Sequence, residues 1–351
     1  MVELGPNRQA AHCARAALTH WGLSDAELAF ASARENIVYR VDTRDGASFA
    51  LRLHRPGYHS LPELRSENQW TTALNEAGIA TPRPVPTLSG DAYALIPFGD
   101  SGSDTRVVGL IEWIVGMPMS DVLLAGTDSL PQLMRNVGTL IARLHEHALR
   151  WTPPAGFVRP ALDVDGLLGD EPFWHPFWTL PELDDAQSTL ILRARDQMRQ
   201  ELRDFDQRAD AYSLIHADML PQNIIVRDGQ PVVIDFDDSA FGWHLYDLAN
   251  ALLPYQSYAS FGSVVRATVE GYRRVRPLAE TDLQMLPMFM VIRQLAVLGW
   301  LDRKVATELH VSAEQKIGRA ELLAPRIKSA LAGCQAVLEH VNPFPQMGPL
   351  S

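Results

Sequence analysis

Two polar segments in the second half of the chain carry the side chains best suited to chemistry. The first begins at His216 and contains Asp218 and Asn223, and the second begins at Asp235. A carboxylate such as Asp218 can orient and deprotonate a hydroxyl group, while Asn223 and Asp235 offer hard oxygen ligands for Mg²⁺. A carboxylate and a carboxamide together bind the ion without the excess negative charge that would repel ATP. These residue types in this order suit phosphoryl transfer from ATP.

Two other interpretations of these residues are open at this point. Asp218 and Asn223 are common in polar turns, so the loop could simply connect two strands. His216, Asp218 and His244 could instead be the protein ligands of a metal-dependent hydrolase. Neither interpretation predicts a carboxylate at Asp235, directly after the next predicted strand, and phosphoryl transfer is therefore the favoured hypothesis.

Three motifs in this part of the chain resemble the aminoglycoside phosphotransferase / choline kinase family, whose members have a protein-kinase-like fold. They read HADMLPQN from residue 216, DFDD from residue 235 and GWHLYDLA from residue 242. Protein kinases have Arg where Ala217 stands and Gly where Asp237 stands. Within the family, the run from 232 to 252 most resembles the stress-response kinase / type II homoserine kinase-like group.

The resemblance implies a role for each motif residue. Asp218 is expected to be the catalytic carboxylate, and Asn223 and Asp235 are expected to hold Mg²⁺ on ATP. His216 and Asp247 are expected to support the catalytic loop, because the family's Asp-Leu-Ala motif, which begins here at Asp247, buttresses that loop.

A kinase also needs a cation on its third strand for the α- and β-phosphates of ATP, and an acid on the following helix to hold that cation. Alternation along the predicted strand puts Arg52 on the same face as Ala50 and His54, and the next helix offers Glu67. The family more often has Lys at this position, but a guanidinium keeps the charge and makes a wider, forked contact. An exposed Arg52–Glu67 pair on the surface is the alternative.

The remaining nucleotide-binding segments are less distinctive. Residues 31–36 replace a glycine-rich loop and are expected at the first hairpin, where Ser32 and neighbouring backbone N–H groups could cap phosphates. An ordinary hairpin turn is the alternative. The hinge is expected at residues 112–114, with backbone groups of Glu112 and Ile114 facing adenine, and a plain sheet edge is its alternative.

The acidic run after Asp235 bears on the phosphate acceptor. Asp237 and Asp238 could direct a carboxylate toward an amine-bearing acceptor, or could form a solvated acidic turn. After Asp235 and Phe236, only residues 237–242 precede Trp243, and this segment is too short for the activation loop on which a peptide docks. This spacing favours a small acceptor over a protein.

Two further candidates for acceptor binding lie outside the motifs. Trp178 follows Trp174 by four residues in an aromatic, proline-broken insertion at 153–181, and the pair could form an acceptor wall or cation–π cage. Core packing is the alternative for these rings. Arg293 lies in an otherwise apolar helix, where it could clamp a carboxylate or pair with a buried acid such as Glu270.

The hydrophobic patterning predicts an α+β protein with two lobes, residues 1–115 and 116–351. The first lobe is predicted to be a five-stranded antiparallel sheet with one helix inserted after the third strand. Its strands are expected at 28–30, 37–42, 48–54, 93–97 and 107–115, and its helices at 11–21 and 61–77. The second lobe is predicted to be mainly helical, with long helices at 130–149 and 183–209, short strands at 224–226 and 232–234, and a helical pattern from Leu245 onward.

The composition limits the class of partner and the compartment. The 351 residues include 42 Asp+Glu and 31 Lys+Arg, and the net charge of −11 argues against a nucleic-acid or anionic-membrane surface. Cys13 and Cys334 lack metal or redox spacing, which indicates free thiols in a reducing compartment. The first residues do not resemble a signal peptide, and the apolar stretch 285–301 is expected to be a buried helix. We therefore expect a cytoplasmic protein.

These observations predict an enzyme that transfers the γ-phosphate of ATP, with Mg²⁺, to a hydroxyl group of a small molecule. Amino alcohols, hydroxy amino acids, sugars and aminoglycosides are the acceptor classes considered. A Ser/Thr protein kinase of the stress-response type and a catalytically silent nucleotide-binding protein are the alternatives. The presence of Asp218, Asn223 and Asp235 argues against a silent protein.

Overall fold

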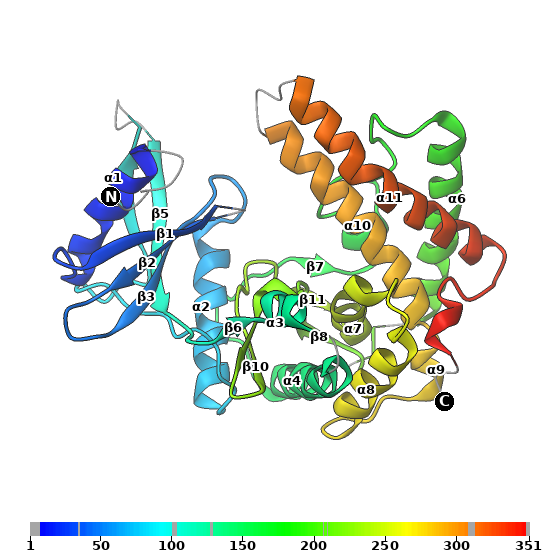
Figure 1. The fold of residues 1–351 in the computed structure, drawn as a ribbon, viewed down its shortest axis with the longest axis horizontal. Helices are drawn as coiled ribbons and strands as arrows, with labels where there is room; N and C mark the ends of the chain where they lie inside the picture. Colours follow the sequence, from blue (N-terminus) through cyan, green and yellow to red (C-terminus); the bar gives the residue numbers. More distant parts are fainter. Residues whose placement is uncertain are drawn as a thin grey trace. The chain divides into compact units, whose positions relative to one another are not determined.

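The structure is a computed structural model that describes residues 8–33, 36–99, 104–126, 129–205, 207–208, 210–307 and 313–348 (Figure 1). By its internal contacts, the chain divides into two units. The first comprises the chain up to Met117 together with Trp151–Arg159 and Val232–Asp237, and the second comprises the rest. Asp235 and Asp237 thus belong to the same unit as Arg52, and Asp218 and Asn223 belong to the other.

The first unit is built on a five-stranded antiparallel sheet with the order β1-β2-β3-β5-β4, as predicted. Helix α1 (Arg8–Ala17) and a 3₁₀ turn (Leu18–Trp21) share a hydrophobic core with one face of this sheet, and Gly22 ends the turn at a φ of 69°. The strands are β1 (Glu27–Ala33), β2 (Ile37–Asp42), β3 (Ser48–Leu53), β4 (Ala94–Phe98) and β5 (Asp104–Glu112).

Helix α2 (Leu61–Glu76) follows β3 in the chain, as predicted. It begins with a capping box in which Ser60 and Glu63 satisfy each other's backbone N–H groups. It ends where Gly78 takes a φ of 75°. Its buried face includes Trp70, whose ring meets Phe236 edge-on with centroids 5.3 Å apart. This contact ties the helix to the segment that carries Asp235.

The second unit is mainly helical, as predicted, and helices α4 and α8 pack closely within it (Figure 1). Glycine makes this close approach possible: a Cβ added at Gly138 would overlap the Thr268 carbonyl, and one at Gly271 would overlap the Arg135 carbonyl. The helices are α3 (Met119–Ala125), α4 (Leu130–Arg150), α5 (Val164–Leu168), α6 (Asp185–Phe205), α7 (His244–Leu252), α8 (Phe261–Arg273), α9 (Glu280–Leu283), α10 (Leu286–Thr307) and α11 (Ala313–Leu338), with 3₁₀ turns at Pro221–Asn223, Leu253–Tyr255 and Pro345–Met347.

A small sheet in the second unit was not predicted from the sequence. Strand β11 (Ala240–Trp243) pairs antiparallel with β8 (Tyr212–Ile215) and parallel with β7 (Ala161–Leu162). Gly242 permits this packing, because an added Cβ would lie 2.6 Å from Cδ1 of Ile215. The other short strands are β6 (Met117–Pro118), β9 (Ile224–Arg227) and β10 (Gln230–Val233).

The apolar stretch near the C-terminus is a buried helix, as expected. Within the described part of the chain, Glu280–Arg303 is long and apolar enough to span a membrane, but 78% of its apolar window is buried inside the protein. Cys13 and Cys334 are both buried and free, which confirms that they form no disulfide.

The glycine contact between α4 and α8 gives a test of the fold. Gly271→Ala should destabilise the protein by about 2–3 kcal/mol, because the new methyl group must displace a backbone carbonyl rather than a flexible side chain. Arg266→Ala, an exposed change on the same helix, is the control and should stay within about 0.5 kcal/mol. Urea unfolding followed by circular dichroism measures both, and equal midpoints for Gly271→Ala and wild type would contradict the packing.

Candidate active site

The loop that carries Asp218 is held from behind by Asp247. This carboxylate, on α7, accepts the backbone N–H of His216 at 2.9 Å and that of Ala217 at 2.6 Å. Ala217 has a left-handed backbone, with a φ of 64°, which a residue with a Cβ adopts only when its surroundings enforce it. Burial raises the pKa of Asp247, and His216 with the two N–H bonds counteracts this effect. Asp247 thus makes two hydrogen bonds to the loop that it was predicted to support.

A buried pair behind Asp247 was missed by the sequence analysis. His145 on α4 places Nε2 3.2 Å from Asp247 and Nδ1 3.0 Å from the Tyr272 hydroxyl. Burial, with a contribution from Arg276, lowers the pKa of His145 well below its ordinary value, so the ring is neutral. The bonding then assigns the proton to Nε2, which donates to Asp247, while Nδ1 accepts from Tyr272. The helical pattern of α4 gives no signal that separates His145 from a core residue.

The Asp218 carboxylate is held at both oxygens. Asn223 donates its Nδ2 group to Oδ2 at 2.6 Å and to the Asp218 carbonyl at 3.1 Å. Arg293 on α10 donates Nη2 to Oδ1 at 2.7 Å. The proposed pairing of Arg293 with Glu270 was wrong, because Glu270 binds Arg135 at 2.7 Å instead. The structure therefore brings Asp218, Asn223 and Arg293 together.

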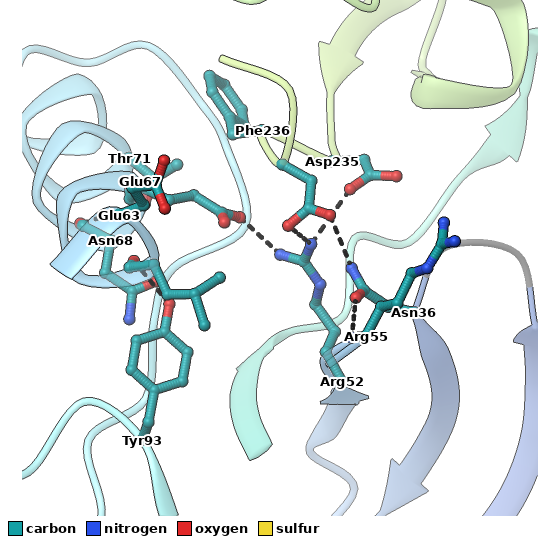
Figure 2. Close-up of polar contacts among 12 residues, drawn as sticks. Asn36, Arg52, Arg55, Glu63, Glu67, Asn68, Thr71, Tyr93, Asp235 and Phe236 are labelled. Carbon is teal, nitrogen blue, oxygen red and sulfur yellow. Dashed lines mark hydrogen bonds and ion pairs between the residues drawn. The ribbon is translucent and has the colours of Figure 1, made fainter. Parts of the chain in front are cut away.

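In the first unit, Arg52 is the centre of a buried ion cluster (Figure 2). Its Nη1 binds Glu67 Oε1 at 2.6 Å, and its Nη2 lies 3.2 Å from Asp235 Oδ1 and 3.2 Å from Asp237 Oδ1. Arg52 is 7% exposed and Glu67 is 4% exposed, so the predicted pair is confirmed and the surface alternative was wrong. Burial alone would lower the pKa of Arg52, but Glu67, Asp237 and Asp235 together raise it above its ordinary value.

Two residues that the sequence analysis did not single out fix the 235–237 segment. Asn36 donates Nδ2 to Asp237 Oδ2 at 3.2 Å and accepts the N–H of Arg55 (Figure 2). Arg159 donates to the carbonyls of Phe236 and Asp237. Asp235, like Ala217, has a left-handed backbone, with a φ of 64°. Asn36 is the last residue of the 31–36 segment expected at the first hairpin, and Arg159 lies in no motif. Only the folded chain shows the contacts that these two residues make.

The structure argues against an acceptor-binding role for Asp237. This residue is 5% exposed, and its carboxylate is bound to Arg52 and Asn36 within the first unit. A carboxylate that compensates a buried guanidinium is not available to an acceptor amine. Asp238 belongs to the second unit, where its charge acts on Tyr246 and Arg293.

The predicted aromatic cage is filled by the protein's own cations. The guanidinium of Arg195 lies 4.3 Å from the centroid of the Trp178 ring, and that of Arg293 lies 5.4 Å from Trp174. Residues 171–180 form turns rather than a helix, so the four-residue spacing of Trp174 and Trp178 does not put the two rings on one helical face. The Trp174 ring also stacks on Tyr246, with centroids 6.0 Å apart. Trp174, and not Trp178, contacts Arg293, which in turn binds Asp218.

The structure can be compared with the sequence at the two segments expected to bind the nucleotide, residues 31–36 and 112–114. Ser32 lies within β1, opposite Val38, and not at a hairpin tip, because β1 extends further than expected. At the expected hinge, Glu112 ends β5 and donates its N–H to Arg83, while Trp113 donates to Ser48. The backbone of Ile114 follows these two bonds and leaves the sheet.

The exposed carboxylate next to Arg52 can serve as a ligand of a hard divalent cation. Glu67, Asp235 and Asp237 surround the single charge of Arg52, and Asp235, with 47% of its side chain exposed, is the accessible one of the three. Among the described residues, no group of three His, Cys, Asp or Glu side chains could hold a metal, which argues against the His216–Asp218–His244 hydrolase site. Magnesium sites in kinases need fewer protein ligands, because phosphate oxygens and water supply the rest.

The geometry of both units matches that of a known family. A model of the phosphotransferase enzyme family matches residues 27–282, which is more than half of the chain. This chain belongs to the phosphotransferase enzyme family. The enzyme is a kinase that transfers a phosphoryl group to a hydroxyl group, and the family uses ATP with a divalent metal ion.

Curated proteins and solved structures of this type cover nearly all of the chain. Amicoumacin kinase of Bacillus subtilis (strain 168) is 23% identical over 93% of this chain and 91% of its own, and homoserine kinase of Methylobacillus glycogenes is 27% identical over 78% and 77%. The structure of a microcompartment-associated aminopropanol kinase matches with a TM-score of 0.79 and 29% identity, over 95% of this chain and 98% of that one. The amicoumacin kinase hAmiN, solved with AMP-PNP, Ca²⁺ and Ami, matches with a TM-score of 0.72 and 22% identity over 91% and 90%. The predicted protein-kinase-like fold is confirmed.

The surroundings of Arg52 give a test by pH. Burial, with a contribution from Arg52, lowers the pKa of His54 to about 3, against about 6.5 in an unfolded chain. His54 is therefore neutral in the folded protein. Its contribution to the free energy of unfolding is complete above about pH 6.5 and is lost as the pH falls toward 3, by up to about 1.4 kcal/mol per pH unit. Other buried histidines add to this loss, so the comparison must be between variants.

His54→Leu should flatten the pH dependence of the free energy of unfolding. His12→Leu, a change at an exposed histidine, should not flatten it. Free energies of unfolding in urea, measured at about pH 7.5 and about pH 5.5, should fall by about 1–2 kcal/mol less in His54→Leu than in wild type. Equal losses in wild type and His54→Leu would show that folding does not lower the pKa of His54.

Proposed function

We propose that this kinase uses Mg·ATP to phosphorylate the hydroxyl group of a small amino alcohol. The observation that carries the acceptor class is the shortness of the chain after Asp235: strand β11 begins at Ala240 and leads directly into α7. The described residues between Asp235 and α7 are thus too few for the activation loop on which a peptide docks, which argues against the protein-kinase alternative. The likeness to an aminopropanol kinase and the net charge of −11, which suits a cationic acceptor, support the same choice.

Asp218 is the proposed general base. As the acceptor oxygen forms its bond to the γ-phosphorus, the bond from that phosphorus to the β,γ-bridging oxygen of ATP breaks, and the hydroxyl proton passes to the Asp218 carboxylate. Asn223 and Arg293 each occupy one lone pair of this carboxylate, so each oxygen keeps another for the acceptor. The side chain is 20% exposed and can therefore be reached.

The remaining site residues are proposed to bind Mg·ATP. Arg52, held by Glu67, would bind the α- and β-phosphates, and Asn223 and Asp235 would supply oxygen ligands to Mg²⁺. The ion would neutralise charge on the phosphates. Because Asn223 donates its Nδ2 to Asp218, its Oδ1 is the atom proposed for the metal.

Further proposals concern the rest of the nucleotide and the cellular location of the enzyme. The backbone of Glu112 and Ile114 would face adenine, and Ser32 would lie near the phosphates. We place the enzyme in the cytoplasm, acting on a free small molecule rather than on nucleic acid or a membrane. The free buried thiols and the acidic composition support this placement.

The test is transfer from [γ-³²P]ATP to a panel of amino alcohols, hydroxy amino acids, sugars and aminoglycosides. We expect 1-amino-2-propanol or a similar amino alcohol to be the best acceptor and the product to be an acid-stable phosphate ester, whereas a phosphoramidate would be acid-labile. Asp218→Asn should lower kcat by at least about 100-fold and leave the KM for ATP nearly unchanged, because a general base acts only in the transition state.

Two outcomes would contradict the proposal. Asp218→Asn with a kcat within about tenfold of wild type would remove Asp218 as the base. Efficient transfer to a protein, with none to any member of the panel, would restore the protein-kinase alternative. Asp204→Asn, a change at the surface end of α6, is the matched control and should retain full activity.

A further inference from the structure

Arg293 is an unusual residue for its position. It lies on α10, whose other residues around it are buried and mostly apolar, and it is 6% exposed. Burying a guanidinium costs several kcal/mol unless an acid compensates it, and a well-packed apolar residue at such a position is often as stable or more so (about 1–4 kcal/mol). Arg293 also lies beyond residues 27–282, the part of the chain that matches the family model. Stability alone therefore does not explain its presence.

The partner of Arg293 is the proposed base itself. Its Nη2 donates to Asp218 Oδ1 at 2.7 Å, while Asn223 donates to Oδ2 at 2.6 Å. Burial alone would lower the pKa of Arg293, but Tyr246, Asp218 and Asp238 raise it above its ordinary value, so the guanidinium stays charged. With one donor on each oxygen, the carboxylate cannot rotate about its Cβ–Cγ bond without breaking a charged hydrogen bond.

An aromatic support holds Arg293 in turn. Its guanidinium lies 5.4 Å from the centroid of Trp174, which is 3% exposed and stacks on Tyr246. Gly299, further along α10, allows the Trp174 loop to approach, because an added Cβ would lie 2.5 Å from the His175 carbonyl. Arg303 donates to the Phe173 carbonyl at 3.2 Å and anchors the same loop. The loop is thus fixed to the helix that carries Arg293.

We infer that Arg293 is a positioning residue for phosphoryl transfer: it fixes the orientation of the Asp218 carboxylate, and Trp174 fixes Arg293. The inference rests on the proposed role of Asp218 as the base. Arg293 does not itself bind the acceptor, because one end of its guanidinium is bound to Asp218 and a face of it is covered by Trp174. Trp174 therefore serves the base and does not form an acceptor cage.

The test compares Arg293→Met, Arg293→Lys and Arg293→Ala with wild type in steady-state kinetics. Arg293→Met should lower kcat by about 100-fold, because displacing a catalytic group by about 1 Å reduces the rate by this factor. The KM values for ATP and for the acceptor should change by less than about threefold. Arg293→Lys should retain more activity than Arg293→Met. Added guanidinium should restore part of the kcat of Arg293→Ala, which a merely structural residue would not show.

Arg195→Met is the matched control. Arg195 is also a buried arginine over a tryptophan, at 4.3 Å from Trp178, but its acid partner is Asp170 and it makes no contact with Asp218. Titration calorimetry with ADP gives the fraction of the variant that is folded. Once it is corrected for this fraction, the kcat of Arg195→Met should match that of wild type. If Arg293→Met does not fold, Trp174→Phe and Arg293→Lys carry the test, each with a kcat below wild type and an unchanged KM for the acceptor.

Three outcomes would overturn the inference. A kcat of Arg293→Met within about threefold of wild type would show that Asp218 needs no second donor. A raised KM for the acceptor with an unchanged kcat would make Arg293 an acceptor-binding residue. In the Asp218→Asn background, a further loss from Arg293→Met as large as that in wild type would show that Arg293 acts independently of Asp218. If Asp218→Asn alone stays active, it is the proposed base that has failed.

Discussion

A guanidinium buried in protein must be compensated by an acid, and this constraint shapes both units of the enzyme. In the first unit, Arg52 is bound by Glu67, Asp235 and Asp237. In the second, Arg293 is bound by Asp218. The acids that compensate the buried charges of these two arginines include both the proposed base and a proposed metal ligand. Each ion pair therefore holds a carboxylate with a proposed role in catalysis in one orientation while it compensates a buried charge.

The backbone around these acids is held with equal firmness. Ala217 precedes Asp218 in a left-handed conformation, and Asp235 itself adopts one, at a cost of about 1–2 kcal/mol for a residue with a Cβ. Asp247 binds two N–H groups at the first position, and Arg159 binds two carbonyls next to the second. Strained backbone persists only where several bonds enforce it, and such positions cluster at functional sites. Of the five described non-glycine residues with a positive φ, Ala217 and Asp235 are the two that lie in the proposed catalytic segments.

Local pattern in the sequence was enough for part of this account. Strand alternation put Arg52 on one face of β3, and a helix with Glu67 came next, so the ion pair could be predicted from residues 15 apart in the chain. The antiparallel sheet and most helices followed from period and turn residues. The motif around Asp218 was enough to predict that Asp218 and Asn223 lie together, because both are on one short loop.

Contacts between distant segments could not be predicted in this way. Arg293 lies 75 residues from Asp218, and periodicity says only that it faces the interior, which left Glu270 as an equally reasonable partner. Asp237 looked free in the sequence, because nothing local shows that Arg52 and Asn36 bind it. Trp174 and Trp178 were read on a helix that does not form. Strand β11 escaped notice because its four residues pair with strands that are also very short.

The most direct test of the central claim is a crystal structure of the enzyme with Mg²⁺, AMP-PNP and an amino alcohol. We expect the acceptor hydroxyl to lie within hydrogen-bond reach of an Asp218 carboxylate oxygen, at about 2.6–3.2 Å. We also expect Arg293 to remain bound to Asp218, and Arg52 to bind phosphate oxygens while it keeps its bond to Glu67. An acceptor hydroxyl bound away from Asp218, or a nucleotide that leaves Arg52 without a phosphate contact, would contradict the claim.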